Sequence, residues 1–92
     1  MFSYESMILL RLNSDGPNYI RGLAQSLSQL LGRTIHESSM HDAMTHLHKR
    51  GLVKKSRLHS KSDGRLRIYY SLTPAADETI KTICHDFKLL CE

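Results

Sequence analysis

The chain has 92 residues, 40% of them hydrophobic and 24% charged, with two cysteines and a formal net charge of +4. This length allows one domain, residues 1–92, on one small core, and the composition excludes collagen-like, mucin-like and disordered chains and a disulfide-stapled secreted scaffold. The longest apolar run, residues 7–10, is too short to cross a bilayer, so we expect a cytoplasmic protein without a membrane partner.

Two helices are predicted before residue 32. The first spans residues 4–12 and ends in a cluster of turn-forming residues at positions 13–17. The second spans about residues 20–31, where apolar side chains recur at spacings of three and four, and Gly32 supplies its left-handed end. We expect the apolar side of each helix to face the core.

A third helix is predicted from about His36 to Arg50, with Gly51 as its stop. Thr34 and Glu37 have the spacing of a capping box, which would start the helix one or two residues earlier. The buried stripe of this helix consists of Met40, Ala43, Met44 and Leu47.

After Gly51 the hydrophobic period changes from helical to alternating, which predicts a β-hairpin. Its first strand spans residues 52–58, and its tip spans residues 60–64. In the second strand the alternation directs Arg65, Arg67 and Tyr69 outward. The inner face of that strand is then formed by Leu66, Ile68, Tyr70 and Leu72.

A last helix follows Thr73, an N-cap, and Pro74 at the first helical position, and it runs to about Leu90. Its apolar residues alternate at spacings of four and three, a heptad-like seam. We expect residues 74–92 to pack partly on their own core and to cross to a second subunit in their distal turns; a helix absorbed within one subunit is the alternative. The expected dimer-interface residues are Ala76, Ile80, Ile83, Cys84, Phe87 and Leu90.

The element order predicts a mainly α fold with a small β-hairpin, a winged helix-turn-helix over residues 1–73. In this motif the third helix enters the major groove of DNA, and the hairpin, or wing, reaches the neighbouring backbone. Residues 49–67 contain eight basic residues against Asp63 alone, a charge of +7 on the end of that helix and the wing. A basic run is often only a solvated face, but this position favours DNA binding.

The wing segment Gly64-Arg65-Leu66-Arg67-Ile68-Tyr69-Tyr70-Ser71-Leu72-Thr73 resembles that of the PadR family of winged-helix transcriptional regulators, and the likeness extends over about residues 7–76. The chain departs from the family pattern at Leu66, Ala76 and His41. The resemblance implies a homodimeric, repressor-like regulator that binds a palindromic operator in double-stranded DNA, with recognition helices about 34 Å apart. It also implies a small hydrophobic effector in some members; control by the regulator's own abundance is the alternative.

The candidate DNA-binding residues lie on the solvent side of the third helix and on the wing. Hydroxyl, imidazole and carboxylate groups of the helix suit base edges, whereas wing cations suit phosphates or the minor groove. Arg65 and Arg67 have bracing of the hairpin as an alternative role. The full set is Ser38, Ser39, His41, Asp42, Thr45, His46, Lys49, Lys55, Arg57, Lys61, Arg65 and Arg67.

No metal site, cofactor or enzyme is predicted. The four histidines of the third helix are separated by five, five and two residues, and none of these spacings places two imidazoles on one metal. The sequence has no glycine-rich phosphate loop, nucleophile elbow or paired carboxylates with an evident pocket. The competing hypothesis is a winged helix that serves as a protein-interaction or assembly module, for which a basic wing is less suited.

Overall fold

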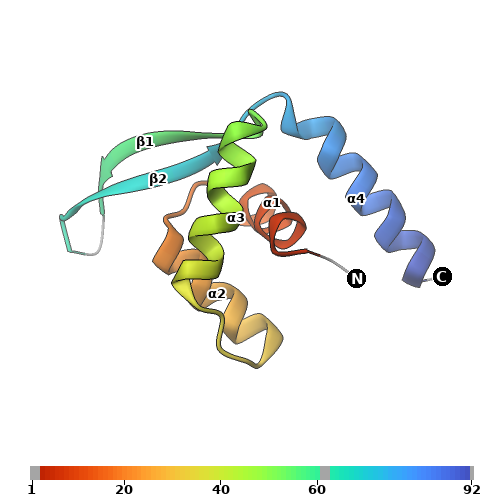
Figure 1. The fold of residues 1–92 in the computed structure, drawn as a ribbon, viewed down its shortest axis with the longest axis horizontal. Helices are drawn as coiled ribbons and strands as arrows, with labels where there is room; N and C mark the ends of the chain where they lie inside the picture. Colours follow the sequence, from red (N-terminus) through yellow and green to blue (C-terminus); the bar gives the residue numbers. More distant parts are fainter. Residues whose placement is uncertain (1–2, 61–62, 92) are drawn as a thin grey trace.

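A computed structural model gives the fold of residues 3–60 and 63–91 (Figure 1). Its elements, in chain order, are α1 (Tyr4–Asp15), α2 (Ile20–Leu31), α3 (Glu37–Lys49), β1 (Val53–His59), β2 (Leu66–Leu72) and α4 (Ala76–Cys91). The mainly helical winged helix-turn-helix is confirmed, and α2 has its predicted bounds. α1 continues beyond its predicted end to Asp15, where Gly16 leaves the helical conformation at a φ of 86°.

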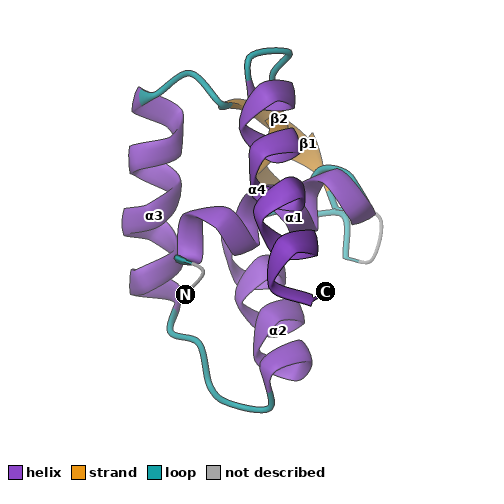
Figure 2. Ribbon diagram, turned by 90° about the vertical axis from the view of Figure 1, so that its right-hand side faces the viewer, coloured by secondary structure: helices purple, strands orange, loops and turns teal. Residues whose placement is uncertain are grey.

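The core lies between the first three helices and is closed by the base of the hairpin and the start of α4 (Figure 2). Ile8 of α1, Leu23 of α2 and Met44 of α3 are fully buried in it. Burying each such side chain contributes about 1.5–3 kcal/mol before the cost of ordering the chain. Since one side of α3 is held by this core, its opposite side faces solvent.

α3 begins within one residue of the predicted start near His36, but the earlier start that a capping box would give is not found. The helix begins at Glu37 with His36 as its N-cap and without a side-chain cap hydrogen bond, so Thr34 and Glu37 form no capping box. The Ser28 hydroxyl instead accepts a hydrogen bond from the Ile35 N–H at 2.9 Å. This bond ties the connection before α3 directly to α2.

β1 and β2 pair antiparallel, with Val53 opposite Leu72 at the base of the hairpin. Asn18, in the connection before α2, exchanges two backbone hydrogen bonds with Tyr70 at 3.1 and 2.8 Å. β2 is therefore anchored to the connection that leads into α2.

Between Tyr70 and the tip of the hairpin, the predicted inner face of the wing is wrong. Leu66 and Ile68 are 56% and 44% exposed, because the distal half of the hairpin extends past the helices (Figure 1). Arg67, predicted to point outward, is the less exposed residue, with 24% of its side chain accessible. Alternation identified which residues share a face, but no helix of the described chain covers that face here.

α4 begins at Ala76, later than predicted. The Thr73 hydroxyl donates to the Gly51 carbonyl at 2.6 Å instead of capping the helix. Ala76 and Ile80 are buried in the core of their own chain, and α4 packs on α1 along the side of the molecule opposite the hairpin (Figure 1). No helix in the described residues is long and apolar enough to cross a membrane.

Candidate nucleic-acid interface

The solvent side of α3 carries a narrow polar stripe. At 3.6 residues per turn, four exposed side chains fall within about 60° of one another. These are Ser38, Asp42, Thr45 and Lys49. They offer hydroxyl, carboxylate and ammonium groups, the donors and acceptors that read base edges in the major groove.

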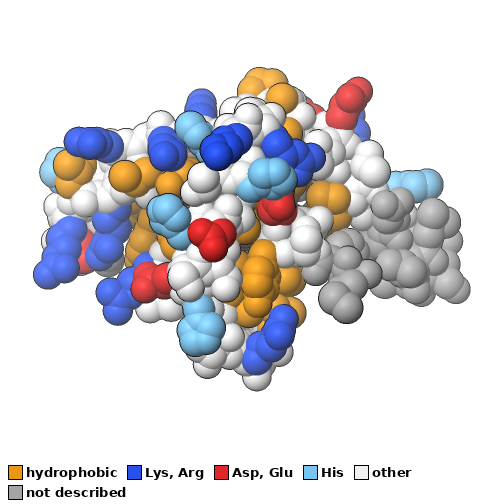
Figure 3. All heavy atoms as spheres, in the orientation of Figure 1, with side chains coloured by type: hydrophobic (Ala, Val, Ile, Leu, Met, Phe, Trp, Pro, Cys, Tyr) orange, Lys and Arg blue, Asp and Glu red, His pale blue; other side chains and the backbone are white. Residues whose placement is uncertain are grey.

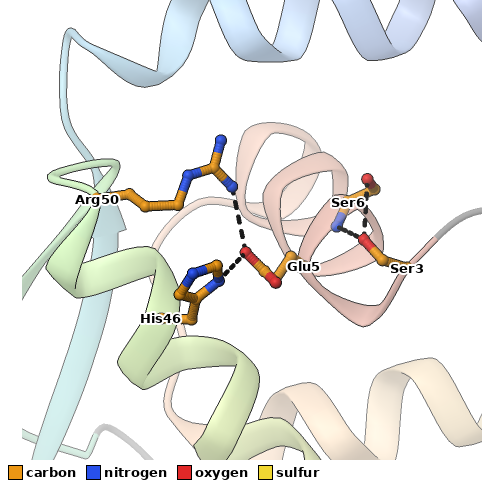
Figure 4. Close-up of polar contacts among 5 residues, drawn as sticks. All are labelled: Ser3, Glu5, Ser6, His46 and Arg50. Atoms are coloured by element: carbon orange, nitrogen blue, oxygen red, sulfur yellow. Dashed lines mark hydrogen bonds and ion pairs between the residues drawn. The ribbon is translucent and has the colours of Figure 1, made fainter.

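The other candidates on α3 lie on its flanks. Ser39 is half-buried, and exposed His41 faces the wing, where it lines a groove with β2 and the start of α2. His46 lies on the opposite flank, with its Nδ1 atom 2.8 Å from a carboxylate oxygen of Glu5 in α1 (Figure 4). His41 and His46 thus lie on opposite sides of the stripe, and of these two only His46 has an acidic partner among the described residues.

The wing presents free cations. Lys55 and Arg57 lie opposite Tyr70 and Ile68, so all four share one face of the hairpin. Lys55, Arg57 and Arg65 are exposed and form no ion pair with any described residue. Figure 3 shows basic side chains gathered over the hairpin and over the adjoining end of α3. The predicted contact Lys61 lies outside the described residues.

Arg67 braces the wing. Its guanidinium lies 4.7 Å from the centre of the Tyr19 ring and forms a 2.6 Å ion pair with Asp63. The Tyr19 ring also meets the Tyr69 ring edge-on, with 5.4 Å between centroids. Of the two roles considered for Arg67, bracing is therefore the one that its contacts support.

The acidic partner in this brace has an altered pKa. The Arg65 backbone N–H and the Arg67 guanidinium both donate to Asp63, and they hold the pKa of its carboxyl below the usual value. The same ion pair raises the pKa of Arg67. Because the folded-state pKa of Asp63 is depressed, the ionised carboxylate stabilises the folded protein. This stabilisation is complete above the unfolded-state pKa and is lost as pH falls through the folded-state pKa.

We predict that the brace loosens in acid. The ring-proton NMR signals of Tyr19 and Tyr69 should shift as pH falls below about 4, the ordinary carboxyl pKa. Asp63→Asn should show the loosened signals already at neutral pH and no such transition. Identical titrations of the two proteins would contradict the assignment.

An open groove of about 310 Å³ separates α3 from the wing and the start of α2. It is lined by Tyr19, Ile20, Arg21, His41, Arg67, Ile68 and Tyr70. This lining contains two arginines, a histidine and no carboxylate. Because the Arg67 guanidinium is already paired with Asp63, Arg21 and His41 are the lining groups suited to a backbone phosphate that passes between the recognition helix and the wing.

The predicted dimer residues fall into three groups. Ala76 and Ile80 are covered within their own chain, whereas Ile83 and Cys84 are half-buried at the edge of the core. The side chains of Phe87 and Leu90 lie outside those that the structure describes. Among the described residues, no cluster of three or more His, Cys, Asp or Glu side chains could hold a metal ion.

The comparison with protein families decides the class of this fold. A model described as the transcriptional regulator PadR-like family matches residues 8–82. The chain belongs to the PadR-like family. As a PadR-like protein it is a DNA-binding transcriptional regulator rather than an enzyme, and the polar stripe of α3 and the basic wing form the surface suited to that activity.

Solved structures share the PadR-like fold. A PadR-like regulator from Bacillus cereus has a TM-score of 0.84 and 21% identity, over 95% of this chain and 82% of that one. A transcriptional regulator from Clostridium thermocellum has a TM-score of 0.76 and 23% identity, over 94% and 83%. A PadR family regulator from Clostridium difficile has a TM-score of 0.77 and 20% identity, over 95% and 88%. No curated protein matches the sequence.

Sequence reasoning missed two residues of this PadR-like interface. Arg21 is exposed in the first turn of α2 and lines the groove, and Tyr19 supports Arg67. Arg21 had a usable signal, because the helix before a recognition helix crosses the DNA backbone and a basic residue at its start suits a phosphate. Tyr19 had none, since its partners Arg67 and Tyr69 are distant in sequence.

Proposed function

We propose that the protein is a homodimeric repressor that binds a palindromic operator, with α3 in the major groove and the wing on the flanking backbone. The observation that carries this proposal is the exposed polar stripe of α3 beside a wing whose exposed cations Lys55, Arg57 and Arg65 form no ion pair with any described residue. Base edges give such a site its sequence preference and phosphates its affinity. A dimer that occupies an operator represses by exclusion and needs no further partner.

The pairing of subunits is supported by apolar surface away from the wing. An open groove of about 600 Å³ runs between α1 and α2 and is lined by Met7, Leu10, Arg11, Ser14, Leu27 and Leu30. Leu30 is 63% exposed and lies in the lining of this groove beside Met7 and Leu10, and a contiguous apolar surface of this kind is typical of a protein contact. We propose that this groove receives the distal turns of α4 from a second subunit, so that residues 1–73 read DNA and residues 74–92 pair the subunits.

This pairing gives a direct prediction for Leu30→Glu. A buried charge at the interface should raise the monomer–dimer dissociation constant at least about 10-fold, measured by sedimentation equilibrium. Leu58→Glu removes an exposed leucine of the wing instead and should leave the dimer intact. Equal dissociation constants for both variants and the unchanged chain would contradict the groove as the dimer contact.

The operator is tested by selecting bound duplexes from a random pool. We expect enriched sequences with two inverted half-sites whose centres lie about 10 base pairs, one helical turn, apart. Enrichment of a single half-site would contradict the dimer. Failure to enrich any sequence would favour the protein-interaction module, which is the alternative function.

Two further parts of the proposal rest on the family alone. We place the regulator in the cytoplasm, because its family acts on DNA. The small hydrophobic effector stays a prediction beside the alternative of control by abundance.

A further inference from the structure

Glu5 joins the N-terminal helix to the end of the recognition helix (Figure 4). One of its carboxylate oxygens lies 2.8 Å from His46 Nδ1 and accepts a hydrogen bond from Arg50 Nη1 at 3.2 Å. Because a carboxylate only accepts, His46 carries its hydrogen on Nδ1. Two potentially cationic side chains of the DNA-reading segment therefore share one acid.

Local structure sets up this contact. Ser3 caps α1 by accepting the Ser6 N–H at 3.2 Å, which fixes the first turn that carries Glu5. His46 and Arg50 are four residues apart, so they lie one above the other on the same side of α3 and its C-cap. Both can reach the same oxygen only because α1 packs against α3.

The geometry also determines what these two side chains would do without the acid. His46 is about 60° and Arg50 about 100° around the helix axis from Lys49, the cation at the end of the polar stripe. Their side chains remain 60% and 47% exposed, whereas that of Glu5 is 26% exposed. Released from Glu5, both side chains are free to turn toward the phosphates that flank the recognition helix, Arg50 as a cation and His46 as a hydrogen-bond donor.

We propose that Glu5 is a specificity-determining residue of the DNA interface, which holds His46 and Arg50 on α1 and away from the DNA backbone. The proposal rests on DNA binding by the α3 stripe and the wing. Phosphate contacts strengthen binding to every sequence, whereas base contacts strengthen binding to the operator alone. By withholding the Arg50 guanidinium and the His46 imidazole N–H from the phosphates, Glu5 keeps the ratio of operator to random binding high.

The test replaces Glu5 with an isosteric neutral residue. Glu5→Gln should raise affinity for random duplex several-fold and affinity for the selected operator by less, so that the specificity ratio falls. The slope of log affinity against log salt for random duplex should steepen by about 0.9 for each added phosphate contact. Glu78→Gln is the matched control, because it removes one negative charge from an exposed position in the first turn of α4 that forms no ion pair with the described residues.

A second substitution identifies the released cation. In the Glu5→Gln background, Arg50→Gln should return random-duplex affinity and salt slope most of the way to their original values. In the unchanged chain, the same substitution should alter random-duplex affinity by no more than about twofold, since Arg50 makes no phosphate contact there. The measurement of Arg50→Gln in the unchanged chain needs no Glu5 variant. It still tests the proposal if Glu5→Gln unfolds, which thermal denaturation would detect.

Three results would overturn the proposal. The first is that Glu5→Gln and Glu78→Gln change random-duplex affinity and its salt slope equally. The second is that Glu5→Gln raises the affinities for random and operator duplexes equally. The third is that Arg50→Gln alone causes a large loss of random-duplex affinity. Absence of duplex binding by the unchanged protein would instead overturn the proposed function itself, so the two failures are distinguishable.

Discussion

Neutralising Lys55, Arg57 and Arg65 together with glutamine is expected to weaken binding to operator and random duplexes alike, by about 100-fold at moderate salt. The three side chains are exposed and form no ion pair with any described residue, so no described ion pair is lost with their charge. Because phosphates are the same in every sequence, the specificity ratio should barely change. A gel-shift titration with both duplexes measures this outcome.

The matched control for the wing variant is Lys81→Gln, which removes an exposed cation from α4 on the side opposite the hairpin. It should leave both affinities nearly unchanged. Loss of operator binding alone in the triple variant would mean that these residues read bases. Unchanged binding to both duplexes would remove the wing from the interface.

Leu47→Ala is expected to lower the free energy of unfolding by about 2–5 kcal/mol, out of a total of about 5–15 kcal/mol for a domain of this kind. Leu47 is fully buried and lies on the core side of α3. Its truncation leaves a cavity beneath the recognition helix, so the helix should lose its support and DNA binding should fall with stability. Denaturant unfolding at one fixed protein concentration measures the change.

Leu66→Ala provides the comparison for this substitution. The same side chain is removed, but Leu66 is 56% exposed on the distal wing, so the expected change is within about 0.5 kcal/mol. A large loss for Leu66→Ala would mean that the distal hairpin is covered in solution. A small loss for Leu47→Ala would contradict the packing of α3 on the core.

Much of the fold follows from hydrophobic periodicity. Apolar spacings of three and four across residues 20–31 define a helix with one buried side, and Gly32 ends it in the left-handed conformation. Two features of the wing did not follow. Alternation assigned Ile68 to the covered face, but whether a face is covered depends on how far the strand extends past its neighbours. The outward position predicted for Arg67 ignored Tyr19, which attracts its guanidinium.

The candidate site was predicted in part for a related reason. Helical spacing alone places Ser38, Asp42 and Lys49 together on solvent. It cannot reveal that His46 is bound by Glu5, because these residues are 41 positions apart and meet only through the packing of α1 on α3. Charge density located the basic wing, but the pairing of individual charges is a property of the folded chain.

We infer that α3 and the wing of this PadR-like protein bind DNA through bases and phosphates together. The affinity for a selected operator and for a random duplex of equal length, measured over a range of salt concentrations, tests this joint binding. We expect steep, nearly parallel lines, with a slope of about −0.9 per phosphate contact and tighter binding of the operator throughout. Affinity that is independent of salt, or equal for the two duplexes, would contradict the claim.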